Sequence, residues 1–337
     1  MSLPGRIVAD TVSPITDLAQ ARDLVAEDMA QVDAFIRQSL RSDVVLIRQV
    51  AEYIIGNGGK RLRPLIHLLA ARAFGYEGEN HIRLAAIVEF IHTATLLHDD
   101  VVDESDRRRG RDTANAVWGN AASVLVGDFL YSRSFQMMVE VGSMDIMSLL
   151  ADATNTIAEG EVLQLMNLGD PDVTEESYLK VIQCKTAKLF EAACAMGAVL
   201  ANAGDARQSS MARFGRSLGI AFQLADDAMD YEGDADAMGK NLGDDLAEGK
   251  PTLPLIRVLE CGTSDERALI RAVLEHGGAD KMEEVVHAIR RCGALDFVND
   301  RARQYAAEAK AEVMKLPTSR FREALAFVAR FSCERQI

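Results

Sequence analysis

Residues 96–103 of the chain, LLHDDVVD, place three aspartates at the end of an apolar run. The apolar residues from Leu84 onward recur every three or four positions, which is the period of a helix with one buried face. On a helix, residues i and i+4 lie on the same face, so Asp99 and Asp103 point in the same direction. Because like charges at this spacing repel each other, the pattern DDxxD predicts a bound cation.

The same acidic pattern occurs again at residues 222–230, FQLADDAMD, with Asp226 and Asp230 on one helical face. A single DDxxD is most often a solvated acidic surface. Two of them, each closing an apolar helical run, favour a site for Mg²⁺, a hard cation that takes oxygen ligands and bridges to phosphates. Neither segment has the twelve-residue loop with a central glycine of an EF-hand, which disfavours a calcium site of that kind.

Composition limits the classes of protein to which the chain can belong. Of its 337 residues, 48% are hydrophobic, enough for a sizeable core, and the formal charge of −14 argues against sequence-independent binding of nucleic acid. Five cysteines without a CxxC pair favour a reducing cytoplasm over a disulfide framework or a zinc site. We see no signal peptide and no apolar run near the ~20 residues of a membrane span. A soluble protein is therefore expected.

The spacing of proline indicates long helices. None occurs between Pro64 and Pro171 or between Pro171 and Pro251, and proline breaks the interior of a helix. No sustained alternation of polar and apolar residues points to strands. We therefore expect an all-α protein with roughly ten or more helices. Since no interior linker is evident, one helical domain is expected over residues 25–337, after an N-terminal extension at residues 1–24.

Basic residues of the kind that hold phosphate oxygens lie near both motifs, and the planar fork of arginine suits them best. They fall in five places, namely residues 58–64 (GGKRLRP), residues 107–110 (RRRG), residues 185–186 (KT), Lys240 and Lys250. Each alone would be read as a surface charge. The spacing of a P-loop is absent from the GGK segment. Together with paired acids, these residues favour a site for magnesium and phosphate.

Two further polar residues lie on the acidic faces. His92 precedes Asp99 at helical spacing, and Gln223 precedes Asp226 in the same way, so each is a candidate phosphate ligand. A lone histidine or glutamine on a helix is more often structural. The neighbouring pair His98-Asp99 also suggests a metal phosphohydrolase of the HD type, but the remaining histidines lack the spacing that such a site needs.

Five segments of the chain, in order and spacing, resemble the trans-polyprenyl diphosphate synthases. They are GGKRLRP, IHTATLLHDDVVDESDRRRG, KTAKLFEA, FQLADDAMD and GKNLGDDLAEGKPTLP, and the similarity runs from about residue 25 to the C-terminus. The segment IAEGEVLQLMN, residues 157–167, resembles the octaprenyl-forming bacterial members more than the farnesyl branch.

This resemblance implies an all-α, isoprenoid-synthase-type bundle in which a ring of helices surrounds a deep central cavity. It implies a homodimer that binds three Mg²⁺ ions and condenses an allylic diphosphate, such as farnesyl diphosphate, head to tail with isopentenyl diphosphate. The expected product is octaprenyl diphosphate for a quinone side chain such as that of ubiquinone, with nonaprenyl and decaprenyl diphosphate left open. Membrane contact would be at most transient, for product release.

The resemblance also assigns roles to individual residues. The implied metal ligands are Asp99, Asp103, Asp226 and Asp230. The residues assigned to catalysis are Asp99, Asp100, Asp103, Asp226, Asp227 and Lys185. Those expected to hold isopentenyl diphosphate are Lys60, Arg63, His92 and Arg109. Those expected to hold the allylic diphosphate are Arg108, Lys185, Thr186, Gln223, Lys240 and Lys250.

Product length is expected to depend on side chains one turn before Asp99. In short-chain members of the family, bulky aromatic residues near this point close the tunnel for the product tail. Here Ala94 and Thr95 are small, so the tunnel should continue. Its floor is expected from residues 123–139, where four large side chains remain open as candidates, namely Phe129, Tyr131, Phe135 and Met138.

The chain departs from the family pattern in two places. Arg107 extends the usual arginine pair to three, which leaves open which arginine holds which diphosphate, and Ala228 and Met229 replace a larger aliphatic pair. Two alternatives within or beside this chemistry are a terpene cyclase or head-to-head synthase, and a non-catalytic partner subunit. Both are disfavoured, because the second motif is a full DDxxD and the expected basic residues are all present. A purely structural helical protein would leave both motifs unexplained.

Overall fold

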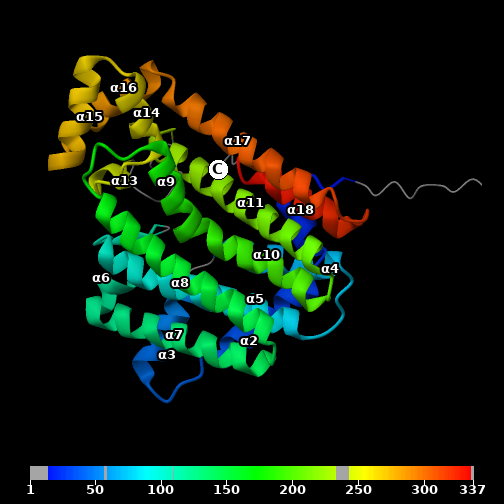
Figure 1. Ribbon diagram of the computed structural model, residues 1–337. Helices are drawn as coiled ribbons and strands as arrows, with labels where there is room; N and C mark the ends of the chain where they lie inside the picture. Colours follow the sequence, from blue (N-terminus) through cyan, green and yellow to red (C-terminus); the bar gives the residue numbers. More distant parts are fainter. Residues whose placement is uncertain (1–13, 57–58, 109, 233–242, 335–337) are drawn as a thin grey trace, which may run out of the picture.

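The computed structural model describes residues 14–56, 59–108, 110–232 and 243–334 (Figure 1). The first helices are α1 (Leu18–Asp23), α2 (Ala26–Ser39), α3 (Val45–Gly56), α4 (Leu62–Ala73), α5 (Asn80–Val102), α6 (Ala114–Trp118), α7 (Asn120–Val141), α8 (Met144–Asn167) and α9 (Glu175–Ile182). The π-helical turn η1 (Gln183–Ala187) leads into α10 (Lys188–Leu200) and α11 (Asp205–Glu232). The remainder are α13 (Asp244–Ala247), α14 (Leu253–Cys261), α15 (Ser264–His276), the 3-10 turn η2 (Ala279–Lys281), α16 (Met282–Arg291), α17 (Ala294–Val313) and α18 (Arg320–Phe331).

Strands contribute almost nothing to the described part of the chain. Within it, the two short strands β1 (Arg107–Arg108) and β2 (Arg111–Asp112) form one antiparallel pair. This hairpin follows the first acidic motif directly. The prediction of an all-α protein is therefore confirmed.

The centre of the fold is helix α10, which packs against α4 and α5 on one side and α11 on the other (Figure 1). Most of its residues are buried, as expected of a helix that is apolar on nearly every face. Glycines on α11 let the two helices approach closely. A Cβ at Gly215 would overlap the Phe190 carbonyl oxygen, and one at Gly219 would lie 2.5 Å from the Cα of Ala187. The close packing fixes α11, and with it the second acidic motif, against η1 and α10.

The large central core lies around α2, α4, α5, α7 and α10. Smaller clusters lie between α9, α11, α14 and α17, and between α14, α15 and α16. At the N-terminal end, Ile15 and Ala21 are buried in the central core, and α1 packs against α18. Among the described residues, no helix combines the length and apolarity needed to cross a membrane.

Candidate active site

The two acidic motifs lie at the C-terminal ends of the long helices α5 and α11. Asp99 and Asp100 fall in the last turn of α5, and Asp103 is the residue that caps it. Asp226 and Asp227 fall within α11, two turns or less from its end. Helix C-termini carry partial negative charge, which adds to the charge of the aspartates. Each motif is thus a local concentration of negative charge at the end of a rigid helix.

Each aspartate of the first motif has a basic partner from a different part of the chain. Lys185 Nζ lies 3.5 Å from Asp99 Oδ1, and Lys250 Nζ lies 2.9 Å from Asp103 Oδ2. Arg108 Nε donates to Asp100 Oδ1 over 2.7 Å. The structure therefore brings together three residues that were predicted separately from the sequence as phosphate ligands.

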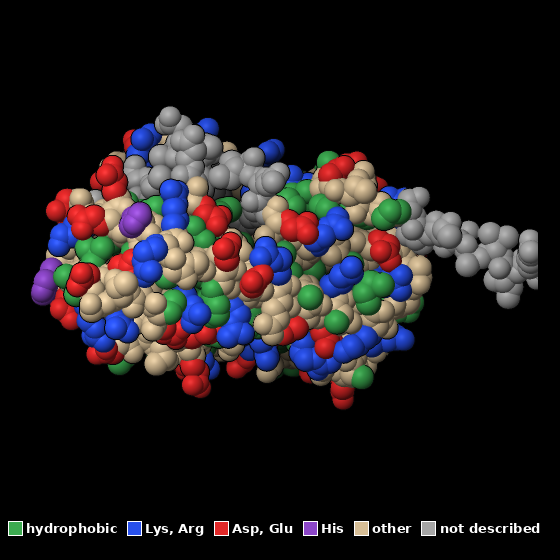
Figure 2. Space-filling view, turned by 90° about the horizontal axis from the view of Figure 1, so that it is seen from above, with side chains coloured by type: hydrophobic (Ala, Val, Ile, Leu, Met, Phe, Trp, Pro, Cys, Tyr) green, Lys and Arg blue, Asp and Glu red, His purple; other side chains and the backbone are tan. Residues whose placement is uncertain are grey.

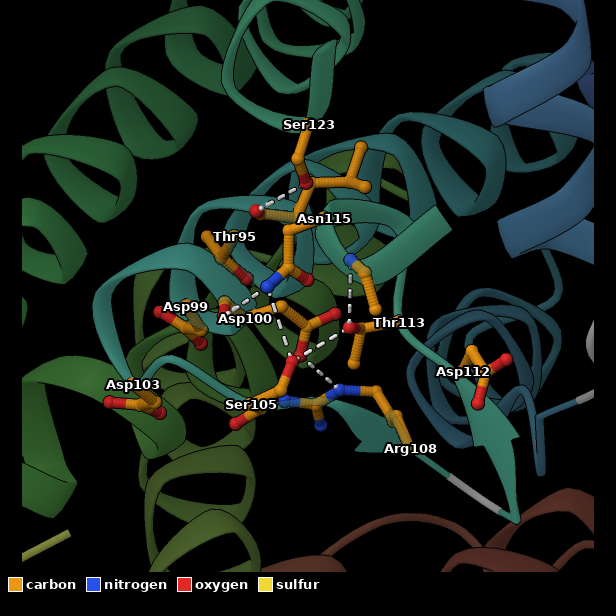
Figure 3. A network of polar contacts seen from close by, with 12 residues as sticks. Thr95, Asp99, Asp100, Asp103, Ser105, Arg108, Asp112, Thr113, Asn115 and Ser123 are labelled. Atoms are coloured by element: carbon orange, nitrogen blue, oxygen red, sulfur yellow. Dashed lines mark hydrogen bonds and ion pairs between the residues drawn. The ribbon is translucent and has the colours of Figure 1, made fainter. Parts of the chain in front are cut away.

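Asp100 is turned into the protein, whereas Asp99 and Asp103 lie on the other side of the same turn (Figure 3). Its side chain is 1% exposed, and burial raises the pKa of Asp100 although Arg108 opposes the shift. Asn115 donates to the Asp100 and Ser105 carbonyl oxygens, at 3.1 and 3.2 Å. These contacts fix the turn after α5 and the strand that carries Arg108.

In the second motif, neutral donors hold the middle aspartate. The Tyr178 hydroxyl donates to Asp227 Oδ2 over 2.5 Å, and Gln223 Nε2 donates to Asp227 Oδ1 over 2.7 Å. Burial, with repulsion from Asp245, raises the pKa of Asp227 well above its ordinary value. Asp230 is 7% exposed and accepts the backbone N–H of Asp245.

The π-helical turn η1 connects the two motifs. Lys185 reaches the first motif on α5, while the next residue, Thr186, donates to Gln223 Oε1 on α11 over 3.0 Å. π-helical turns are uncommon and often occur at functional sites, because the extra residue redirects neighbouring side chains. Here the consecutive residues Lys185 and Thr186 contact side chains on α5 and α11 respectively.

Lys185 is shared between two carboxylates. It donates to Glu161 Oε2 on α8 over 2.5 Å and lies beside Asp99. Burial opposes its charge, but Asp99 and Glu161 together raise the pKa of Lys185. Burial raises the pKa of Glu161 to about 7, assisted by repulsion from Asp99 and opposed by Lys185. The Lys185 ammonium group is therefore charged, and it lies between Glu161 on α8 and Asp99 on α5.

Of the residues predicted to bind isopentenyl diphosphate, Lys60 lies just before α4, Arg63 on α4 and His92 on α5. Arg63 Nη1 is 3.1 Å from His92 Nε2, and the Arg63 guanidinium lies over the Phe190 ring at 4.4 Å. Lys60 Nζ lies 6.0 Å from the centre of the Phe331 ring. A pocket lined by residues that include His92, Asp100 and Arg108 opens beside them.

Two predicted residues, Arg109 and Lys240, lie outside the described residues, so their positions are not part of this geometry. Among the described residues, no three His, Cys, Asp or Glu side chains gather to form a metal site by themselves. The carboxylate oxygens of Asp99 and Asp103 are nevertheless the kind of donor that Mg²⁺ prefers, and they are 15% and 10% exposed. The donor chemistry fits this ion.

A model of the family described as polyprenyl synthetase matches residues 44–291. The chain belongs to this family. The octaprenyl diphosphate synthase of Escherichia coli (strain K12) is 52% identical over 95% of this chain and 99% of its own. The all-trans-nonaprenyl-diphosphate synthase (geranyl-diphosphate specific) of Rhodobacter capsulatus is 46% identical over 92% of this chain and 96% of its own.

Solved structures agree with this family assignment. A polyprenyl synthase from Caulobacter crescentus, solved with calcium and isoprenyl diphosphate, has 45% identity and a TM-score of 0.92, covering 95% of this chain and 98% of its own. The predicted family, the isoprenoid-synthase-type fold and the assignment as a prenyltransferase enzyme are therefore confirmed.

The residues predicted to govern chain length in this polyprenyl synthetase occupy different environments. Ala94 is fully buried in the central core, whereas Thr95 is half-buried and donates from its hydroxyl to the His92 carbonyl oxygen. Among the predicted floor residues, Tyr131 and Phe135 have ring centres 5.4 Å apart on α7.

Sequence reasoning missed three residues that the structure places at the site. They are Glu161 on α8, Tyr178 on α9, and Glu248, which pairs with Lys250. Glu161 and Tyr178 lie on other helices than their partners Lys185 and Asp227, so the spacing within one helix carries no trace of these contacts. Glu161 lies within the segment 157–167 that supported the long-chain resemblance, and that was the available signal.

Proposed function

We propose that this chain extends farnesyl diphosphate, or a similar allylic diphosphate, with isopentenyl diphosphate units to form octaprenyl diphosphate. The observation that carries the proposal is the joining of the two acidic motifs by consecutive residues, Lys185 and Thr186. This arrangement places the basic residues Lys185 and Lys250 beside the acids of the first motif and links η1 to the helix of the second. The 52% identity with an octaprenyl diphosphate synthase supports the product length.

We infer that three Mg²⁺ ions bind this site, held by Asp99 and Asp103 on α5 and by Asp226 and Asp230 on α11. Bound ions would offset the negative charge that develops on the leaving diphosphate. The carboxylate oxygens supply the donors, and in the free enzyme Lys185 and Lys250 lie beside Asp99 and Asp103.

The basic residues would exchange partners when substrates bind. Lys185 and Lys250 now face Asp99 and Asp103, and each has spare N–H donors for diphosphate oxygens. Thr186, Gln223, Arg108 and Lys240 complete the set proposed for the allylic diphosphate. The set proposed for isopentenyl diphosphate is Lys60, Arg63, His92 and Arg109.

The chemical step needs no protein nucleophile. The allylic C–O bond breaks and leaves an allyl cation and a diphosphate, and the double bond of isopentenyl diphosphate attacks the cation. The proton lost from the resulting carbocation goes to the departed diphosphate. Lys185, Lys250 and Arg108 stabilise the charge on that group. The apolar core around α5, α7 and α10 excludes water, which would otherwise trap the cation.

The growing tail is proposed to extend from the site along α5, past Thr95, toward α7. Nonaprenyl or decaprenyl diphosphate is the second candidate product, because a nonaprenyl and a decaprenyl diphosphate synthase from Rhodobacter capsulatus are 46% and 44% identical to this chain.

The product would supply the side chain of a quinone. All five cysteines are free thiols, which suits the reducing cytoplasm.

We propose a homodimer formed through α7 and α8. These helices expose large apolar side chains, among them Leu125 at 66%, Met144 at 75% and Met166 at 73%. The face seen in Figure 2 is different, because basic and acidic side chains alternate over it and apolar ones are scattered. An apolar surface of this kind is typical of one that a partner covers. Analytical ultracentrifugation of the wild type and of L125E tests the dimer.

The function is tested by incubating the purified chain with Mg²⁺, farnesyl diphosphate and labelled isopentenyl diphosphate, and resolving the products by length. An eight-unit product is expected, and chelation of the metal should abolish it. A nine- or ten-unit product would select the second candidate. No incorporation by a folded dimer would overturn the proposal and favour a partner subunit.

A further inference from the structure

Glu161 has no role in the condensation described so far, yet it makes a close polar contact to a residue of the site. Its Oε2 accepts from Lys185 Nζ over 2.5 Å, and Lys185 in turn lies 3.5 Å from Asp99. The three side chains come from α8, η1 and α5. They are 31%, 17% and 15% exposed respectively, so all three are largely enclosed.

The backbone beside Glu161 is shaped for this contact. Gly160 packs against η1 so closely that a Cβ there would lie 2.6 Å from the Lys185 backbone nitrogen and 2.8 Å from Cys184 Cβ. A glycine therefore lets α8 approach the π-helical turn, and the next residue then reaches the Lys185 ammonium. The π-helical turn and the glycine together position the backbone of Lys185. Glu161 positions the ammonium group at the end of its side chain.

A contribution to stability alone does not account for this arrangement. An ion pair between two long side chains adds little to stability by itself, since ordering the side chains offsets most of the attraction. Lysine has a flexible four-carbon stem, and a free ammonium would occupy many positions. Fixing it before the substrate arrives removes an entropic cost from binding and from the reaction.

We propose that Glu161 is a positioning residue that holds Lys185 in place for the allylic diphosphate. This inference rests on the proposed function, in which Lys185 binds that group. Glu161 acts only through Lys185 and does not itself contact the reacting atoms. Its removal should therefore weaken the use of the allylic substrate and leave the isopentenyl site unaffected.

The experiment is a double-mutant cycle with E161Q, K185Q and the combined variant, using Mg²⁺, farnesyl diphosphate and isopentenyl diphosphate. The control is E159Q, because Glu159 lies on the same helix and is exposed, and it accepts from Asn155 over 2.9 Å. We expect E161Q to lower kcat/KM for farnesyl diphosphate about 10-fold, within the range of coupled neighbours. The KM for isopentenyl diphosphate should stay within about 2-fold.

In the K185Q background, adding E161Q should change kcat/KM by less than about 2-fold. E161D, which keeps the charge, should recover part of the loss. Calorimetric binding of farnesyl diphosphate, without the second substrate, gives an independent measurement for each variant. A full 10-fold loss in the K185Q background would show that Glu161 acts independently and would overturn the inference, as would an unchanged E161Q.

Wild-type turnover in the same assay separates this inference from the proposed function. A wild type that forms no product contradicts the function. An active wild type with additive effects in the cycle contradicts only the role of Glu161. Thermal unfolding of E161Q, expected to match that of E159Q, excludes misfolding as the cause of a loss.

Discussion

The two acidic motifs share a sequence pattern but differ in how their middle aspartates are held. Asp100 on α5 is buried and paired with the charged guanidinium of Arg108. Asp227 on α11 is also buried, but a phenol and an amide donate to it. In both motifs the middle residue points into the protein. The outer aspartates are the ones left for ligands in the proposed site.

The difference shows how the same spacing is adapted to two local structures. The first motif ends its helix and is followed by the β1–β2 hairpin, which supplies Arg108. The second motif lies near α9, which packs against α11 and supplies Tyr178. A charged partner balances an ionised carboxylate at Asp100. At Asp227, burial and repulsion from Asp245 raise the pKa, although the two neutral donors oppose the shift. The middle aspartates should therefore respond differently to the same substitution.

We expect the largest effect at the outer aspartates, and we expect the loss of activity to be the same in the two motifs. D99N and D226N should each lower kcat by about 10²–10³-fold, because each removes a carboxylate ligand from the Mg²⁺ ions proposed to stabilise the leaving diphosphate. Steady-state kinetics with farnesyl diphosphate measures both. D128N is the control, since Asp128 is 61% exposed on α7. A D226N enzyme within about 10-fold of the wild type would mean that the second motif is not a ligand site.

The next largest effect is expected at the π-helical turn η1, whose residues contact both motifs. G160A places a methyl group against the backbone of Lys185 and should destabilise the fold by about 1–3 kcal/mol, as overpacking does. Activity should fall at the same time, since Lys185 and Thr186 both move. G56A is the matched control, because a Cβ at Gly56 meets nothing within 4 Å. Equal unfolding free energies for the two variants would contradict the close approach of α8 to η1.

The sequence was sufficient for the fold class and for the two faces of acids, since helical spacing and the absence of proline are local signals. It also identified Lys185 and Lys250, which the structure brings to Asp99 and Asp103. It did not reveal the partners Glu161 and Tyr178. Those contacts depend on how α8 and α9 pack against η1 and α11, and packing angles between distant helices are not encoded in the spacing within one helix.

The middle aspartates provide the direct test of the contrast. D100N removes a buried charge and leaves Arg108 without its ion pair, so it should destabilise the protein by about 2 kcal/mol. This is less than for a fully buried pair, because the Arg108 side chain is 29% exposed. D227N should cost less than about 1 kcal/mol, since Tyr178 can either donate or accept and the raised pKa already favours a neutral group. Urea denaturation measures the free energy of unfolding of both variants. Equal losses of stability would mean that the two middle aspartates are not held differently.

The smallest effect on activity is expected at Tyr178, which is 5% exposed and bonds only to the second motif in the contacts described above. Y178F removes one donor from Asp227 and should destabilise the protein by about 1 kcal/mol. Because Gln223 links Asp227 to Thr186, kcat/KM for farnesyl diphosphate should fall a few-fold, while the pairing of Lys185 with Asp99 persists. Y305F, on α17 beside the same apolar cluster, is the control. If Y178F also abolished the coupling between Glu161 and Lys185, the two sides of the π-helical turn would not act separately, and the contrast between the motifs would fail.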